Sequence, residues 1–185
     1  MLQPSANAAN SGAALHQFAI SSRASAMVAP PQTWQQVANA KSIPTSLKAI
    51  VHGVGLSEAL AELLLGDSHS VRRSIGCPET GFLNVAGDVQ SVEDCVNIGH
   101  PQPNTNLRIL DERAQPCPIG AQGELLIGGM CVSDGYADAP LLSSQRFVLD
   151  QFGSQPSAQL FRTGITCAWR ANGSIRIVNE NKHLT

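Results

Sequence analysis

One short stretch of the chain joins residue types that could do chemistry, Ser74-Ile75-Gly76-Cys77-Pro78-Glu79-Thr80. A glycine directly after a strand lets the backbone turn sharply, which would leave Glu79 at the carboxyl edge of a sheet. A carboxylate in that place can hold Mg²⁺ bridged to phosphate groups. We therefore predict a weak nucleotide or magnesium site from Ser74, Gly76 and Glu79. A polar loop that binds no ligand is the alternative.

Other signatures of catalysis or metal binding are missing from the sequence. It contains no G-x-S-x-G, no G-x-x-x-x-G-K-[ST] and no G-x-G-x-x-G, and so lacks the usual elbow and phosphate-loop patterns. The histidines stand singly, and no pair has metal-ligand spacing: His16, His52, His69, His100 and His183. We predict no metal site and no catalytic residue.

The cysteines point to a reducing environment. Their number is odd, no C-x-x-C occurs, and their spacing is irregular: Cys77, Cys95, Cys117, Cys131 and Cys167. A disulfide framework or a zinc site is therefore not expected, and we predict a cytoplasmic protein.

The composition excludes several classes of protein. The chain has 185 residues, 43% of them hydrophobic, and a net charge of -2. Such a balance neither attracts nucleic acid nor favours intrinsic disorder. No apolar run approaches the roughly 18 residues of a membrane span. Charged residues make up only 14%, against about a quarter in ordinary soluble domains, which suggests a surface packed against other domains.

The elements that must position the candidate site alternate between helix and strand. Residues 1–12 are expected to be a flexible lead-in. Residues 13–80 then predict helix, strand, helix, strand, helix and strand, at 13–20, 24–29, 31–39, 47–52, 56–65 and 70–75. In the third helix Leu56, Leu60 and Leu63 lie on one apolar face, and Gly66 is expected to end it. This alternation predicts a small parallel sheet covered by helices, with ligand-binding loops after the strands.

The rhythm changes after residue 80. Short strands are expected at 82–86, 106–111, 123–127, 160–166 and 174–178, with one helix at 140–147. Turn residues separate the strands, including Gly99-His100-Pro101 and Asn172-Gly173; the latter is typical of a hairpin. The fold class is therefore α/β, with a distorted antiparallel β-barrel over residues 81–182.

Several stretches of this second part carry a family resemblance. Residues 98–129, IGHPQPNTNLRILDERAQPCPIGAQGELLIGG, resemble the adenylation domains of nonribosomal peptide synthetases, which belong to the AMP-forming acyl and aminoacyl ligase superfamily. The likeness continues through Gly135-Tyr136 and Gln145-Arg146-Phe147-Val148, and through Phe161-Arg162-Thr163-Gly164, which resembles Y-R-T-G-D. Upstream, Leu47–Leu60 resembles the family's strand, glycine turn and helix. Residues 75–80 resemble Y-G-P-T-E. The resemblance covers about residues 20–182.

This sequence departs from the family where the resemblance implies function. Of Y-G-P-T-E only Gly76 and Glu79 remain, and Pro78 lacks the hydroxyl and N–H that a phosphate oxygen could use. The Asp that holds the ribose hydroxyls in the family is Ile165 here. No glycine-rich phosphate loop precedes these motifs. Lys182 stands at the family's hinge position, and the lid with its catalytic lysine is expected to be missing.

The resemblance and the departures lead to three readings. The first is a noncatalytic, truncated adenylation-like domain that acts as a structural platform in a synthetase and needs no cofactor. The second is half of a working adenylation domain, completed by another segment or chain and using ATP, Mg²⁺ and an amino or carboxylic acid. The third is a small-molecule binding module near residues 74–83. We favour the first because no outside segment can replace Ile165.

The same reading predicts partners. Neighbouring domains of the synthetase would pack against the chain, and nucleic acid and membranes would not. An exposed edge of the parallel sheet is expected, covered by residues 1–20 or by a second copy or partner.

Overall fold

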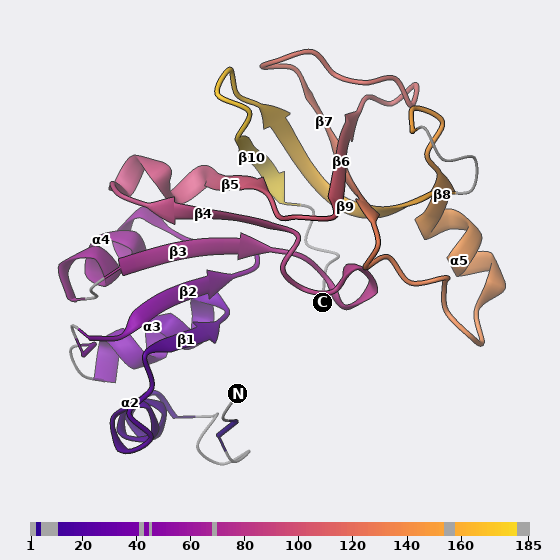
Figure 1. Cartoon of the computed structure of the whole chain (residues 1–185). Coiled ribbons are helices and arrows are strands. Elements are labelled where there is room, and N and C mark those ends of the chain that lie inside the picture. The colour runs from indigo at the N-terminus through magenta and orange to yellow at the C-terminus, as the bar shows by residue number, and fades with distance from the viewer. Residues whose placement is uncertain are drawn as a thin grey trace. The chain divides into compact units, whose positions relative to one another are not determined.

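The computed structural model describes residues 3–4, 11–40, 43–44, 46–67, 70–153 and 158–180. They form two compact units (Figure 1). The first unit comprises Met1–Ser74 and Gly87–Asn97, and the second comprises Ile75–Ala86 and Ile98–Thr185. The units are thus interleaved along the chain, whereas the sequence predicts two consecutive halves at 13–80 and 81–182. Of the expected lead-in 1–12, few residues are described, and Gly12 already begins a helix.

Helices and parallel strands alternate in the first unit, as predicted. The elements are α2 (Gly12–Ser21), β1 (Ala26–Ala29), α3 (Pro31–Ala40), β2 (Lys48–His52), α4 (Glu58–Asp67), β3 (Ser70–Ile75) and the 3-10 helix η2 (Val92–Val96). β1 pairs with β2, and β2 with β3, both in parallel. Pro31 begins α3, a place where its missing N–H costs nothing. Gly66, expected to end α4, lies inside it.

One apolar core holds the first unit together. Trp34 of α3 is fully buried, and its indole Nε1 donates to the Ile50 carbonyl of β2 at 3.1 Å. Leu60 and Leu64 of α4 pack into the same core. A guanidinium also enters the interior: Arg73 of β3 is 1% exposed and donates to the Cys95 carbonyl of η2. Burying it among carbonyl acceptors lessens its desolvation penalty.

Antiparallel strands dominate the second unit. Its elements are η1 (Pro78–Thr80), β4 (Val85–Val89), β5 (Asn97–Pro101), β6 (Thr105–Leu110), β7 (Gln122–Gly129), α5 (Pro140–Arg146), β8 (Phe147–Leu149), β9 (Gln159–Trp169) and β10 (Ile175–Glu180). β4 and β5 begin or end in the first unit. The stretch Gly99–Pro101, expected as a turn, belongs to strand β5.

The antiparallel strands, predicted as a distorted β-barrel over residues 81–182, do not close into a barrel. The strand order runs β4-β5-β10-β9-β7-β6, with β6 at its end, and β8 pairs with β9 alone. Strand β9 pairs with β8 near residue 160 and with β10 from residue 165 onward. Because β9 exchanges one neighbour for another along its length, the described sheet branches instead of closing. The α/β class and the antiparallel second part are confirmed.

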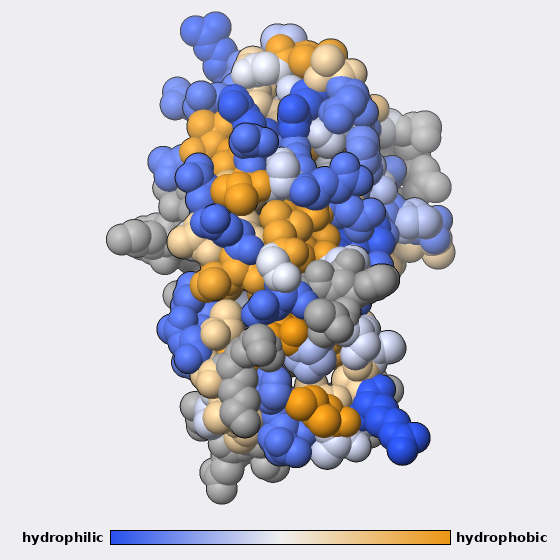
Figure 2. All heavy atoms as spheres, turned by 90° about the vertical axis from the view of Figure 1, so that its left-hand side faces the viewer, coloured by the Kyte–Doolittle hydropathy of each residue, from blue (hydrophilic) through white to orange (hydrophobic). Residues whose placement is uncertain are grey.

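Large apolar side chains also remain at the surface. In the first unit they are Ile20, Val28, Leu63 and Val96. Figure 2, which faces the side where α4 lies, shows apolar atoms gathered among hydrophilic ones. No helix in the described part of the chain is long and apolar enough to cross a membrane.

Candidate functional site

The stretch predicted as a nucleotide site is a tightly folded turn after β3. Its glycine is obligatory, because a methyl group at position 76 would lie 2.0 Å from the Phe82 carbonyl oxygen. Asn84 closes the turn through its backbone N–H, which donates to the Ile75 carbonyl at 3.0 Å, and its side-chain amide, which donates to the Thr80 carbonyl at 2.6 Å. Gly76 therefore has a close-packing role that is independent of any ligand.

Of the predicted site residues, Ser74 belongs to the first unit, and Gly76 and Glu79 to the second. Ser74 is 1% exposed, and its hydroxyl lies 3.1 Å from Nδ1 of His52 at the end of β2. Burial lowers the pKa of His52, so this imidazole is neutral at pH 7. The serine hydroxyl is thus engaged inside its own unit.

Glu79 is engaged twice within the second unit. Its Oε1 accepts a hydrogen bond from the Tyr136 hydroxyl at 2.7 Å. Its backbone carbonyl accepts from the N–H of Ser133 at 2.8 Å. Burial, and then the carboxylate of Glu79, raises the pKa of Tyr136 to about 12, so the phenol stays protonated and continues to donate.

Cys77 and Thr80 complete the turn. The Cys77 thiol lies 3.2 Å from the Thr80 hydroxyl. The pKa of this thiol is raised to about 11, mainly because the thiol is buried. A thiol that remains protonated at neutral pH is a poor nucleophile.

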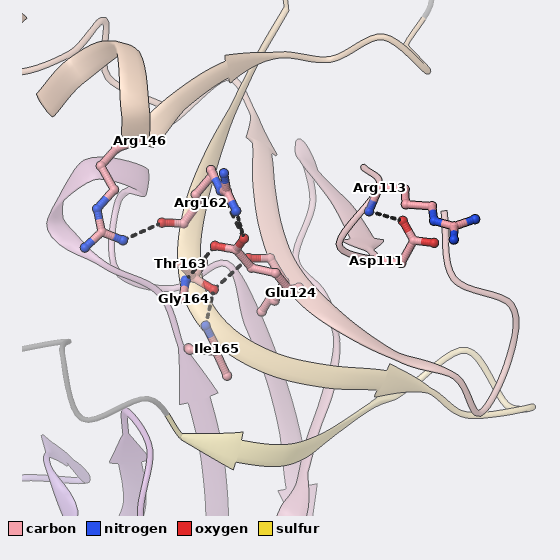
Figure 3. A network of polar contacts seen from close by, with 9 residues as sticks. Asp111, Arg113, Glu124, Arg146, Arg162, Thr163, Gly164 and Ile165 are labelled. Atoms are coloured by element: carbon pink, nitrogen blue, oxygen red, sulfur yellow. Dashed lines mark hydrogen bonds and ion pairs between the residues drawn. The ribbon is translucent and has the colours of Figure 1, made fainter. Parts of the chain in front are cut away.

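A second polar network surrounds Ile165 on β9 (Figure 3). Strand β9 bulges here. Residues 162 and 166 of β9 pair with residues 126 and 124 of β7, so β9 has two more residues than β7 between these pairs. Gly164 allows the bulge with a φ of +74°, a conformation that favours glycine. Bulges of this kind re-aim side chains, and Ile165, which is 3% exposed, is buried.

Glu124 of β7 fastens this bulge. Its Oε1 accepts the N–H of Gly164 at 3.0 Å, and its Oε2 accepts from Nε of Arg162 at 3.0 Å. The hydrogen bond to Glu124 is the main cause that raises the pKa of the Arg162 guanidinium. Both carboxylate oxygens of Glu124 thus have structural partners.

Thr163 and Arg146 hold the bulge from other directions. The Thr163 hydroxyl donates to the Leu125 carbonyl at 2.6 Å and accepts from the N–H of Ile165 at 3.1 Å. Arg146, at the end of α5, donates to the Arg162 carbonyl at 3.3 Å, as Figure 3 shows. Arg146 also acts electrostatically on Tyr136.

Two features of the described residues differ from the magnesium–nucleotide site that the resemblance implies. The position where the resemblance implies the ribose-binding Asp holds Ile165, which is buried and cannot accept a hydrogen bond. Glu79 already has a phenol on one carboxylate oxygen. Among the described residues no group of three or more His, Cys, Asp or Glu side chains could hold a metal ion. Lys182 and His183 lie outside the described residues.

A groove of about 820 Å³ opens elsewhere in the second unit, over β6, β7, β8 and β9. Its floor is the buried cluster of Leu110, Leu126 and Leu160. Glu79 and Tyr136 are not among its lining residues. The cavity therefore does not coincide with the predicted site.

Sequence reasoning missed Tyr136 and Glu124, which hold the two polar networks described above. Both stood in stretches that matched the family, Gly135-Tyr136 and Gly123-Glu124-Leu125, and that match was the available signal. Their partners lie 57 and 38 residues away along the chain. No local pattern encodes contacts over such separations.

Comparison with known proteins identifies the family. The model of the family described as AMP-binding enzyme matches residues 2–137. A linear gramicidin synthase protein from Brevibacillus parabrevis is 43% identical over 129 residues, which are 63% of this chain and 2% of that protein. A dimodular nonribosomal peptide synthase from Bacillus subtilis (strain 168) is 32% identical over 159 residues, or 85% of this chain and 7% of that protein.

A solved structure shows the same relationship. A four-domain nonribosomal peptide synthetase in its holo form, bound to AMP and glycine, superposes with a TM-score of 0.83 at 28% identity, over 95% of this chain and 13% of that one. The chain thus spans a small part of the length of the relatives it matches. The resemblance drawn from the sequence is confirmed: the chain belongs to the AMP-binding enzyme family and is related to the adenylation domains of nonribosomal peptide synthetases.

Proposed function

We propose that the chain is a noncatalytic adenylation-like domain that serves as a structural platform within a nonribosomal peptide synthetase. The observation that carries this proposal is Ile165. It stands where the family resemblance puts the ribose-binding Asp, and it is 3% exposed. A hydrogen bond lost at such a position costs about 1–3 kcal/mol when its partner stays buried.

Two further observations support this proposal. Pro78 can offer neither a hydroxyl nor an N–H to a phosphate, and Glu79 has an internal partner in Tyr136. The interior, in contrast, is intact, with Trp34 and Leu64 fully buried. A preserved fold with an altered site fits a packing role in the cytoplasm among neighbouring domains, with no cofactor.

A working adenylation domain completed by another segment or chain is the second candidate. The observation that favours it is the ordered bulge at Gly164, which Glu124 and Thr163 still hold. ATP, Mg²⁺ and an amino or carboxylic acid would then be the substrates. A binding module that uses residues 74–83 for another small molecule would appear in the same test.

The experiment is a calorimetric titration of the purified chain with Mg·ATP into the millimolar range. The platform proposal expects no saturable heat. Glu79→Gln and Glu112→Gln form the matched pair, because Glu112 is exposed and lies in a turn remote in sequence. Saturable binding that Glu79→Gln removes and Glu112→Gln leaves intact would overturn the proposal in favour of the enzyme part.

The platform proposal includes a partner along β1. This strand stands at the end of the strand order, its four residues carry no charge, and Val28 is 50% exposed. Edge strands are normally protected by charge, proline or a covering element. We infer that a second copy or another partner pairs there, and crosslinking that detects only monomers, with no accessible edge at β1, would contradict this inference.

A further inference from the structure

Glu79 lies at the joint of three segments of the second unit. Its backbone accepts from Ser133 at 2.8 Å and its side chain from Tyr136 at 2.7 Å. Tyr136 in turn donates its backbone N–H to the hydroxyl of Ser143 on α5 at 2.8 Å. The rings of Tyr136 and Phe147 also meet edge to face, with centroids 5.5 Å apart. The turn η1, residues 133–136 and α5 are therefore joined through Glu79 and Tyr136.

We propose that Glu79 is the acceptor of a structural latch, in which the Tyr136 hydroxyl holds Oε1, one of the two carboxylate oxygens that a divalent cation could use. The inference rests on the proposed loss of the nucleotide site, because it gives the retained Glu79 a different task. A cation at Oε1 would displace the phenol and leave its hydroxyl without an acceptor. Phenol and cation thus compete for the same atom.

The surroundings favour the phenol in this competition. Hydrogen bonds to a charged acceptor are about twice as strong as neutral ones. Two contacts hold Tyr136 in place before its hydroxyl is considered, with Ser143 and with Phe147. The backbone bond between Ser133 and Glu79 also keeps its segment beside the carboxylate. The bond therefore forms with little loss of side-chain entropy. The nearest acidic residues in sequence, Asp134 and Asp138, are exposed and are not part of the latch.

Two measurements test the latch. The first is a double-mutant cycle of Tyr136→Phe and Glu79→Ala, read as unfolding equilibria in urea without metal. The latch predicts that the two effects are coupled by about tenfold or more in the unfolding constant. Phenylalanine keeps the ring contact with Phe147, so the single variant folds. Additive effects would overturn the latch.

The second measurement uses MgCl₂ alone. Tyr136 is the chain's single tyrosine, so one ¹³C-tyrosine NMR signal reports the latch directly. We expect millimolar Mg²⁺ to leave that signal in place, and Tyr136→Phe to bind Mg²⁺ at least about tenfold more tightly than the unmodified chain. The double variant should lose this gain. If Mg²⁺ shifts the tyrosine signal at the affinity found in Tyr136→Phe, the competition is refuted.

The outcomes separate this inference from the proposed function. Mg·ATP binding in calorimetry would overturn the platform proposal even if the mutational coupling were found. Additive mutational effects would overturn the latch even if no nucleotide bound. Each idea therefore has its own readout.

Discussion

Replacing Glu124 by alanine tests whether the bulge of β9 depends on one carboxylate. Glu124 accepts from Gly164 at 3.0 Å and from Arg162 at 3.0 Å. Without it, the part-buried N–H of Gly164 loses its acceptor, at a cost of about 1–2 kcal/mol. The ion pair adds only about 0.5–1 kcal/mol, because the Arg162 side chain is 49% exposed. Glu124→Ala should therefore destabilise the chain by about 1.5–3 kcal/mol.

Two further variants divide this effect. Glu124→Gln keeps an oxygen for Gly164 and loses the charge, so it should cost about 0.5–1 kcal/mol. That smaller loss should shrink in 1 M salt, because salt screens the exposed ion pair. Glu112→Ala removes an exposed glutamate and should change stability by less than about 0.5 kcal/mol.

The assay is urea unfolding at 25 °C followed by circular dichroism on all variants. If Glu124→Ala unfolds at the same urea concentration as Glu112→Ala, the carboxylate does not hold the bulge. The reasoning from Figure 3 would then be refuted.

Three more predictions concern backbone, core and pH. Gly164→Ala should lower the stability of the fold by about 1–2 kcal/mol, because Gly164 has a φ of +74°. Gly66→Ala should raise it by up to about 1 kcal/mol, because Gly66 lies in helix α4 with open space around it. Thermal unfolding of both variants tests this contrast. Trp34→Phe should destabilise by about 2–3 kcal/mol, since it loses buried volume and the hydrogen bond to β2; an unfolding midpoint equal to that of the unmodified chain would contradict this. Folding raises the pKa of Tyr136 from 10 to about 12. The stability that the protonated Tyr136 hydroxyl contributes is therefore complete below pH 10 and is lost as the pH rises from 10 to 12. Unfolding measured across that range should show a loss that Tyr136→Phe removes.

Much of the fold could be predicted because local patterns determine it. The proline that begins α3 appears in the sequence as it does in the structure. The apolar face of α4 is correct at Leu60, but Leu63, expected on the same face, is 45% exposed. Whether the barrel closes could not be predicted, because closure requires β6 to pair with a second strand. In the structure β6 stays at the end of the strand order, and β8 pairs with β9. The prediction that Gly66 ends α4 was wrong for a related reason, because Leu60 and Leu64 pack in the core and α4 continues through Gly66.

The candidate site was predictable in its residues but not in their partners. Gly76 and Glu79 were identified from the turn and the family resemblance. Their surroundings depend on Tyr136 and Phe82, whose contacts arise only in the folded chain. The replacement of the family's Asp by Ile165 was visible from its position in the motif, while its burial required the structure.

The interleaving of the two units constrains how this chain can be cut or exchanged. A break after Ser74 would deprive the first unit of residues 87–97, and with them the carbonyl of Cys95 that receives buried Arg73. During synthesis the first unit likewise cannot complete its core until Asn97 has left the ribosome, when residues 75–86 of the second unit are already exposed. A chimaeric synthetase built on this domain should therefore place its junctions outside residues 70–101, so that β3, β4 and β5 come from one parent.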